Sequence, residues 1–154
     1  MKSPNCGFIA VTAFALASLA LPFTSCTNNA NASEDETPKA ESVELLKTSQ
    51  SWDGAELPDY LKGKPELRVL KVTLPPHTSL PKHHHDVMSY GIICKGQLTL
   101  VRESDGKETT VNEGQAVVET VSTVHHGENR GDVPTELYVF YLSQKDMPIS
   151  VADE

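Results

Sequence analysis

The chain has 154 residues, a hydrophobic content of 38% and a formal net charge of −8 at pH 7. This length supports one domain with extra segments, and the composition excludes global disorder. The acidic balance excludes non-specific nucleic-acid binding, which requires a basic surface.

The amino terminus has the pattern of a secretory signal. Lys2 precedes an apolar run from Gly7 to Leu21, which is shorter than the about 20 residues that span a bilayer. Phe23-Thr24-Ser25 leads into Cys26 and resembles a bacterial lipobox, in which the cysteine is lipidated and becomes the new amino terminus. We therefore predict a signal peptide at residues 1–25 and an exported protein. Cleavage after Ala32, at Ala30-Asn31-Ala32, remains the alternative.

Residues 26–42 follow as a predicted flexible tether, because they lack large apolar side chains. Residues 43–154 form the predicted folded domain. Once Cys6 is removed and Cys26 is acylated, Cys94 remains as the one free thiol. It follows an apolar run, so we expect it to be buried as a small hydrophobic residue.

The domain consists of short β-prone runs separated by turn signals. No amphipathic helix is apparent between Val43 and Ser143, and Lys95-Gly96 has the signature of a tight hairpin. Such spacing predicts an all-β sandwich or barrel. The predicted strands are 43–48, 66–74, 87–94, 97–102, 107–111, 115–120 and 136–143.

Three consecutive histidines lie between two of these strands. His83 and His85 are two residues apart, so an extended backbone directs both imidazoles to one side and His84 to the other. Imidazole is a common ligand of zinc, iron, copper and nickel. A third candidate ligand is His125, with His126 beside it.

Together these segments resemble the cupins, whose fold is a double-stranded jelly-roll β-barrel. The first cupin motif, G-x5-H-x-H-x3-E-x6-G, is matched at His83, His85 and Gly96, with Thr78 and Ser89 in place of the first glycine and the glutamate. The second motif, G-x5-P-x-G-x2-H-x3-N, is matched at Gly114, His125 and Asn129, with Thr120 and Ser122 as departures.

The resemblance implies one divalent metal ion (Fe, Zn, Mn or Ni) bound by His83, His85 and His125, with Ser89 at the carboxylate position of the family. Serine is a poor ligand for such ions, so the pattern favours three neutral imidazoles with open coordination positions. Three-histidine iron also occurs in cupins that resemble thiol dioxygenases, which keeps O₂ chemistry open.

Two further residues are candidate catalytic groups. Glu119 lies six positions before His125, so an unbroken strand places both on one face, where Glu119 supplies the missing carboxylate or acts as general base. A solvated glutamate is the alternative. Tyr90, like Tyr138, is a candidate for the cavity wall, although strand aromatics more often belong to the core.

These observations predict a metal-binding cupin of the bacterial cell envelope, with dioxygenase-type chemistry on a small molecule. The alternative is a non-catalytic cupin module that binds or senses a small ligand or metal, since the fold hosts both. The expected partners are a small molecule, the membrane through lipidated Cys26, and a second copy in a homodimer.

Overall fold

We analysed a computed structural model that describes residues 38–153. The predicted signal peptide at 1–25, Cys26, the alternative cleavage site at Ala32 and most of the tether at 26–42 lie outside the described residues. No helix in the described part of the chain has the length and hydrophobicity to span a membrane. Residues from Glu41 onward form one structural unit.

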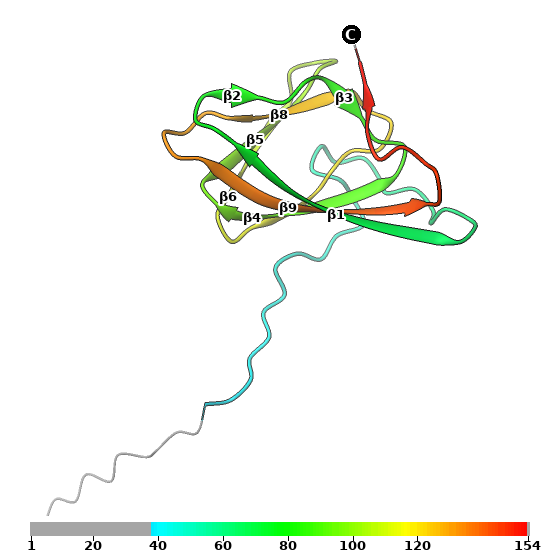
Figure 1. Ribbon diagram of the computed structural model, residues 1–154, viewed down its shortest axis with the longest axis horizontal. Helices are drawn as coiled ribbons and strands as arrows, with labels where there is room; N and C mark the ends of the chain where they lie inside the picture. The colour runs from blue at the N-terminus through cyan, green and yellow to red at the C-terminus, as the bar shows by residue number, and fades with distance from the viewer. Residues whose placement is uncertain (1–37, 154) are drawn as a thin grey trace, which may run out of the picture. The chain divides into compact units, whose positions relative to one another are not determined.

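Ten strands form two antiparallel sheets that face each other (Figure 1). The four-stranded sheet has the order β1 (Pro65–Leu74), β9 (Thr135–Gln144), β4 (Met88–Lys95), β7 (Ala116–Val118). The second sheet has the order β10 (Val151–Ala152), β3 (His83–His84), β8 (His125–Asn129), β5 (Gln97–Arg102), β6 (Glu108–Asn112), with β2 (Thr78–Ser79) paired to β8. The predicted all-β, cupin-type jelly roll is confirmed.

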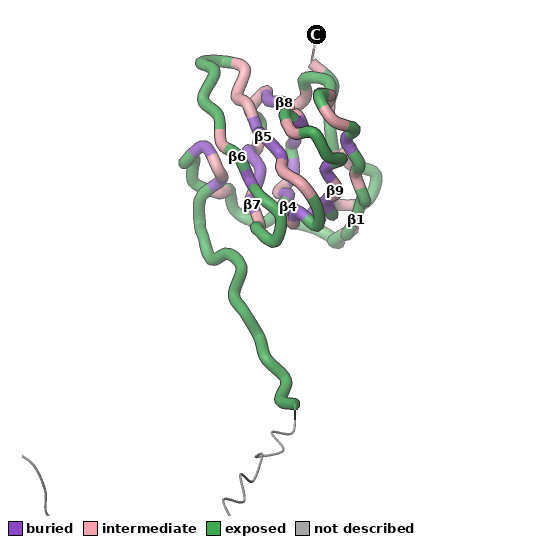
Figure 2. Tube along the Cα trace, turned by 90° about the vertical axis from the view of Figure 1, so that its left-hand side faces the viewer, coloured by how far each residue is buried: buried purple, intermediate pink, exposed green. Residues whose placement is uncertain are grey.

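The hydrophobic core lies between the two sheets, because inward and outward side chains alternate along the strands. In β9, Leu137, Val139 and Tyr141 are buried, whereas Tyr138 is 42% exposed. Figure 2 shows the buried positions on the strands of both sheets. The buried hydrophobic residues are Leu74, Val87, Ile93, Leu98, Leu100, Val111, Val117, Leu137, Val139 and Tyr141.

The segment Lys95-Gly96 is a corner between the sheets and not the predicted hairpin. β4 pairs with β7 and β9, whereas β5 pairs with β6 and β8. Gly96 has a φ of 73°, and a Cβ there would lie 2.9 Å from the carbonyl oxygen of Pro134. A positive-φ glycine serves corners as well as hairpins, so the local signal did not separate the two.

Two local predictions at exposed positions are wrong. Residues 43–48 form no strand, and Val43 is 78% exposed. Their apolar side chains satisfied the β pattern, but no neighbouring strand pairs with them. Cys94 is exposed and not buried. Ile93, which is fully buried, takes the inward position of β4, so its neighbour points outward.

Asn129, from the second motif, has a structural role. Its buried amide nitrogen donates hydrogen bonds to the carbonyl oxygens of Leu74, Pro75 and Val133. Its side-chain oxygen accepts a hydrogen bond from the backbone nitrogen of Gly131 at 2.9 Å. Asn129 thereby fixes the loop that follows β8 against the end of β1.

Candidate metal centre

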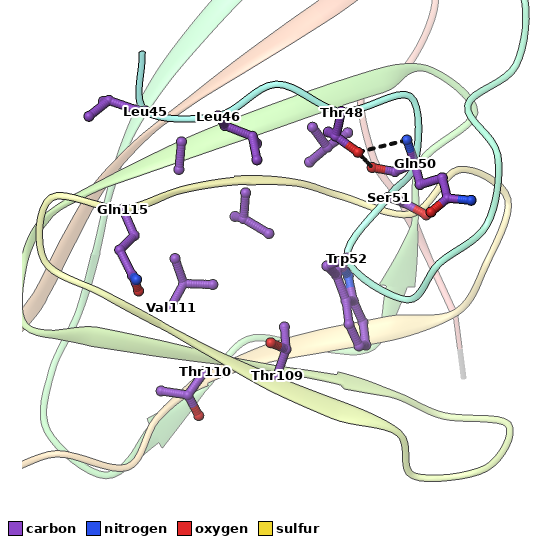
Figure 3. Close-up of a pocket in the computed structure, with 13 residues that line it drawn as sticks. Leu45, Leu46, Thr48, Gln50, Ser51, Trp52, Thr109, Thr110, Val111 and Gln115 are labelled. Atoms are coloured by element: carbon purple, nitrogen blue, oxygen red, sulfur yellow. Dashed lines mark hydrogen bonds between the residues drawn. The ribbon is translucent and has the colours of Figure 1, made fainter. Parts of the chain in front are cut away.

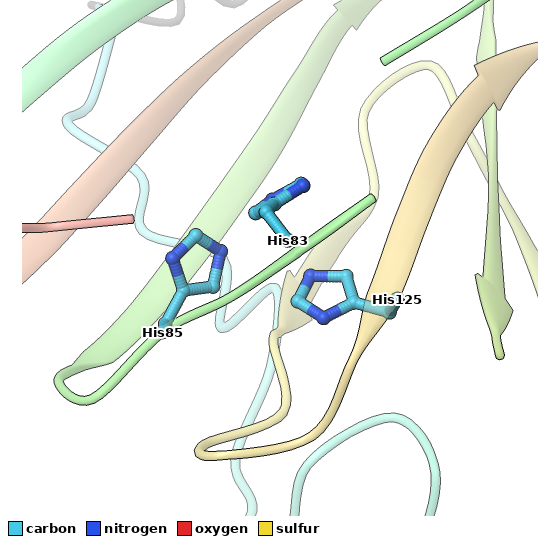
Figure 4. A group of neighbouring side chains, drawn as sticks. All are labelled: His83, His85 and His125. Atoms are coloured by element: carbon cyan, nitrogen blue, oxygen red, sulfur yellow. The ribbon is translucent and has the colours of Figure 1, made fainter. Parts of the chain in front are cut away.

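Three imidazoles from separate parts of the chain converge between the sheets (Figure 4). His83 and His125 are register partners on β3 and β8, and His85 follows β3 directly. The ring centroids are 4.6 Å apart for His83 and His125, 4.9 Å for His83 and His85, and 5.2 Å for His85 and His125. Their candidate ligand atoms lie within 4.8 Å of one another. His85 and His125 are buried, and His83 is half-buried.

Backbone carbonyl groups fix the orientation of all three rings. Nδ1 of each imidazole contacts a carbonyl oxygen: Pro81 for His83 at 2.8 Å, Ile149 for His85 at 2.6 Å and Thr123 for His125 at 2.8 Å. A carbonyl oxygen only accepts hydrogen bonds, so each Nδ1 carries the proton. The Nε2 atoms then present lone pairs, which is the form that binds a metal.

Glu119 brings a carboxylate to the same place. It follows β7 and is buried, and its Oε2 lies 2.6 Å from Nε2 of His85 and 3.9 Å from Nε2 of His125. Neither Nε2 atom has a hydrogen-bond partner of good geometry. With Nδ1 protonated, both buried lone pairs face the carboxylate, and a bound cation would accept the lone pairs and neutralise the carboxylate charge. The residues present fit a divalent metal ion.

The carboxylate has moved to a different strand from the one that the cupin motif specifies. Ser89 occupies the motif position and is 1% exposed. Its hydroxyl donates a hydrogen bond to Oε2 of Glu119 at 3.2 Å, and its carbonyl oxygen accepts one from the backbone nitrogen of Glu119. Glu119, which directly follows β7, thus lies beside the residue at the motif position.

The electrostatics of the cluster favour a charged carboxylate. Burial raises the pKa of Glu119, but contacts with His125 and His85 outweigh burial and hold this pKa well below its ordinary value. Burial lowers the pKa of His83, and the neighbouring His125 and His85 lower it further. Burial also acts to lower the pKa of His125, but its contact with Glu119 dominates and raises it.

The Tyr90 side chain does not reach the histidine cluster, which corrects the prediction that it lines the site. It is the outward neighbour of buried Ser89, is 37% exposed and stacks on Phe140 with a centroid distance of 5.0 Å. Tyr138 also faces outward. The tyrosine that does reach the site is Tyr141, whose ring lies 5.5 Å from that of His85. Its inward position follows from its alternation with Leu137 and Val139.

The other histidines near the site already have acidic partners. His84 is half-buried rather than solvent-exposed, and its Nδ1 lies 2.7 Å from Asp153. Asp86 lies 3.8 Å from Nε2 of His84, on the side away from the cluster. His126 contacts Glu103. These contacts account for His84 and His126 without a metal.

The carboxy-terminal segment completes the site and was not anticipated from the sequence. Ile149 supplies the carbonyl oxygen that orients His85. Strand β10 then pairs with β3, with Val151 opposite His84 and Ala152 opposite His83. The backbone nitrogen of Asp153 donates a hydrogen bond to the carbonyl oxygen of Lys82 at 3.0 Å.

Two hollows adjoin the histidines. A cavity of about 40 Å³ lies inside the barrel, between His83, Glu119, His125 and apolar side chains that include Leu98 and Val139. A groove of about 360 Å³ lies on the outer side of His83. His83 and Tyr141 border both. The groove is lined by Leu70, Val72, Leu80, Pro81, Lys82, His83, Tyr141, Ile149, Ser150 and Ala152.

A further hollow of about 410 Å³ is separate from the histidines. It lies between residues 45–52 and strands β6 and β7 (Figure 3). Trp52 lines it, and the buried indole nitrogen of this residue has no hydrogen-bond partner. None of its lining residues is charged, so it offers no ligand set for a metal.

The fold and the site define a cupin-type jelly roll with a candidate centre for one divalent metal. Residues 70–141 match the family model described as Cupin domain, and this segment contains all three histidines. The match supports the cupin resemblance. No curated protein matches the chain.

Solved structures with a similar arrangement include three that bear functional names. One is an oxalate oxidase in complex with the substrate analogue glycolate, with 24% sequence identity and a TM-score of 0.49, covering 56% of this chain and 45% of that chain. The second is the Bacillus subtilis oxalate decarboxylase with its Mn(II) centres, with 22% identity and a TM-score of 0.48, covering 56% of this chain and 23% of that chain. The third is the DMSP lyase of Ruegeria pomeroyi, with 19% identity and a TM-score of 0.48, covering 56% of this chain and 42% of that chain. This chain spans less than half the length of each.

Proposed function

We propose that the protein is a metal-dependent enzyme that oxidises a small molecule at a single divalent ion, with His83, His85, His125 and Glu119 as the ligands. The observation that carries this proposal is the close, buried contact between Glu119 and the Nε2 atoms of His85 and His125. A set of three imidazoles and one carboxylate suits Fe, Mn, Zn or Ni.

When bound, such an ion supplies Lewis-acid or O₂ chemistry. The protein's own residues orient the ligands and hold a proton beside the site. The carbonyl groups of Pro81, Ile149 and Thr123 hold the imidazoles in one tautomer. Ser89 orients Glu119 through a hydrogen bond. Burial and the charge of Glu119 raise the pKa of Tyr141, so this phenol keeps its proton beside His85.

The sizes of the two hollows support oxygenation. The inner cavity, at about 40 Å³, is lined mainly by leucine and valine and has room for a molecule of the size of O₂, but not for an organic substrate. The groove outside His83 is about nine times larger at about 360 Å³. We therefore assign the organic substrate to the groove and the small apolar reactant to the inner cavity.

The test begins with elemental analysis of protein purified from its native compartment, followed by O₂-electrode measurements with candidate substrates. We expect about one metal per chain and substrate-dependent O₂ consumption that is lost in Glu119→Gln. A protein that lacks metal after reconstitution with Fe(II), Mn(II), Zn(II) and Ni(II) would contradict the proposal.

A non-catalytic binding module is the second candidate, and the small inner cavity is the observation that favours it. The inner cavity, at about 40 Å³, holds a metal ion and a water molecule but not an organic reactant as well. Such a module binds a ligand in the groove without turnover. Ligand binding by calorimetry together with unchanged O₂ and ligand levels after prolonged incubation distinguishes it from the enzyme.

We also propose that the protein is exported and anchored through lipidated Cys26. The support is the sequence pattern of residues 1–26 alone. Intact-mass analysis of the mature protein tests it. We expect an acylated amino-terminal Cys26 and release of the Cys26→Ala variant into the soluble fraction, whereas an unmodified amino terminus after Ala32 would support the alternative cleavage.

A further inference from the structure

The groove outside His83 has an apolar body with one polar end. Val72 and Leu80 form its wall next to the inner cavity, and Leu70 and Ile149 extend it outward. Lys82 is the cation among the lining residues, but its Nζ is held by Glu103 at 2.5 Å. The charge of Lys82 is therefore already matched.

Arg68 lies at the outer end of the same face. It alternates with Leu70 and Val72 along β1, so its side chain projects to the groove side of the strand. Its register partner on β9 is Tyr141, which lines the groove. The positive charge of Arg68 acts to lower the pKa of Tyr141, although burial dominates and raises it. The register pairing places Arg68 and Tyr141 side by side on the two strands.

Arg68 also differs from the other arginines in its partners. Arg102 is bound by Asp53 and Asp105, and Arg130 by Glu108 and Glu128. Within residues 38–153, the Arg68 side chain has neither an ion pair nor a hydrogen bond. A guanidinium with its five donors unused, on the same strand face as the groove-lining Leu70 and opposite Tyr141, is a place for an external anion.

We propose that Arg68 binds the carboxylate of the substrate, and that the groove selects small monocarboxylic acids with an apolar body. This inference rests on the proposed function for the identity of the site, but the binding step itself does not require the metal. The planar guanidinium pairs with both oxygens of a carboxylate. The apolar body then covers Leu70, Val72 and Ile149 and brings its far end towards His83. A dicarboxylate would leave its second charge against apolar side chains.

Calorimetric titration of the metal-loaded protein with hexanoate and with hexanamide tests the inference. Hexanamide has the same apolar body but no charge. We expect Arg68→Gln to weaken hexanoate binding by about tenfold, as for a lost charge-assisted hydrogen bond, and to change hexanamide binding by less than about twofold. Lys71→Gln is the matched control, because Lys71 lies on the outer face of the same strand, paired with Glu136. It should leave hexanoate binding unchanged.

Three results would overturn the inference: no hexanoate binding by the wild-type protein, equal losses for hexanoate and hexanamide in Arg68→Gln, or equal losses in Arg68→Gln and Lys71→Gln. The His125→Ala variant separates this inference from the proposed function. Arg68-dependent hexanoate binding should persist in His125→Ala within about threefold, because the carboxylate contacts the arginine and not the metal. Arg68-dependent hexanoate binding by a wild-type protein that neither binds metal nor turns over a substrate would reject the enzyme and keep the groove.

Discussion

Glu119 and Asp53 are both buried carboxylates, with exposures of 7% and 6%, yet their surroundings differ in kind. Asp53 accepts hydrogen bonds from the hydroxyl of Ser51, the backbone nitrogen of Ala55 and the guanidinium of Arg102. Every one of these partners is a donor. Glu119 faces one donor, Ser89, and two imidazole nitrogens that present lone pairs.

The difference separates a structural carboxylate from a ligand. A buried charge is stable only when it is paired and hydrogen-bonded, and Asp53 meets both conditions within the protein. Glu119 has one side-chain donor, and a cation bound in the cluster would supply the opposite charge. The five predictions below test this distinction, in order of decreasing expected effect.

The largest effect should come from removing a ligand. We expect His125→Ala to lower metal affinity by more than about 100-fold, because one of the three imidazole ligands is lost. His84→Ala is the control, since His84 lies between the candidate ligands His83 and His85 but contacts Asp153. Competition with a chromophoric chelator measures both. Equal metal retention in the two variants would remove His125 from the site.

Asp53→Ala should damage the fold without affecting the metal. We expect the free energy of unfolding to fall by about 2–3 kcal/mol, because the substitution removes the buried acceptor shared by Ser51, Ala55 and Arg102. Asp105→Ala removes a half-exposed partner of the same arginine and should cost less than about 1 kcal/mol. Urea unfolding of the metal-free proteins measures the difference. A metal affinity lowered in Asp53→Ala would break the distinction.

Glu119→Gln should lower the metal affinity more than the stability of the metal-free protein, the opposite of Asp53→Ala. We expect metal affinity to fall by about 10–100-fold, as the anionic oxygen is replaced by an amide. The stability of the metal-free protein should change less than in Asp53→Ala, since the substitution removes a buried charge with a single side-chain donor, Ser89. A large loss of metal-free stability with unchanged metal affinity would make Glu119 structural.

Acid should weaken the fold partly through Asp53. Burial raises the pKa of Asp53, but hydrogen bonds from Ser51, Ala55 and Arg102 outweigh it and keep the pKa below the ordinary value of 3.8. A depressed folded-state pKa contributes stability above the unfolded-state pKa, and this contribution is lost as the pH falls through the folded-state value. Metal-free Asp53→Asn should therefore lose less stability than wild type when the pH falls from 5 to 3. Parallel stability curves would contradict this.

Ser89→Ala should have the smallest effect. Its hydroxyl makes one hydrogen bond to Oε2 of Glu119, so we expect metal affinity to fall by only about threefold. Chelator competition at constant pH measures this, with Thr99→Ala as a buried-hydroxyl control on β5 that does not contact the cluster. A loss as large as that of Glu119→Gln would mean that Ser89 itself binds the metal.

The sequence predicted the fold class because alternation and turn signals are local. It also singled out His83, His85 and His125, through the spacing of two cupin motifs. Glu119 remained ambiguous between ligand and solvated residue, because its place depends on the pairing of β7 with β4, which no local pattern encodes. The bond between Ile149 and His85 joins residues 64 positions apart and carries no sequence signal.

The wrong predictions for Tyr90 and for Lys95-Gly96 also arise from contacts between residues that are distant in the sequence. Tyr90 was a candidate because of its residue type, but the buried position of Ser89 sets the inward side of β4 and turns Tyr90 outward. Lys95-Gly96 has a hairpin composition, yet the pairing of β4 with β9 and of β5 with β8 carries the chain to the other sheet. Both outcomes depend on partners that are distant in the sequence.

The late position of β10 has a consequence for how the protein matures. His85 receives its orienting carbonyl from Ile149, and β3 receives a neighbour from Val151–Ala152, all after strand β9 in the chain. Residues up to Ala152 must therefore be synthesised before all three imidazoles are held in place. A growing chain that ends before Ile149 carries the three histidines but not the complete support of His85.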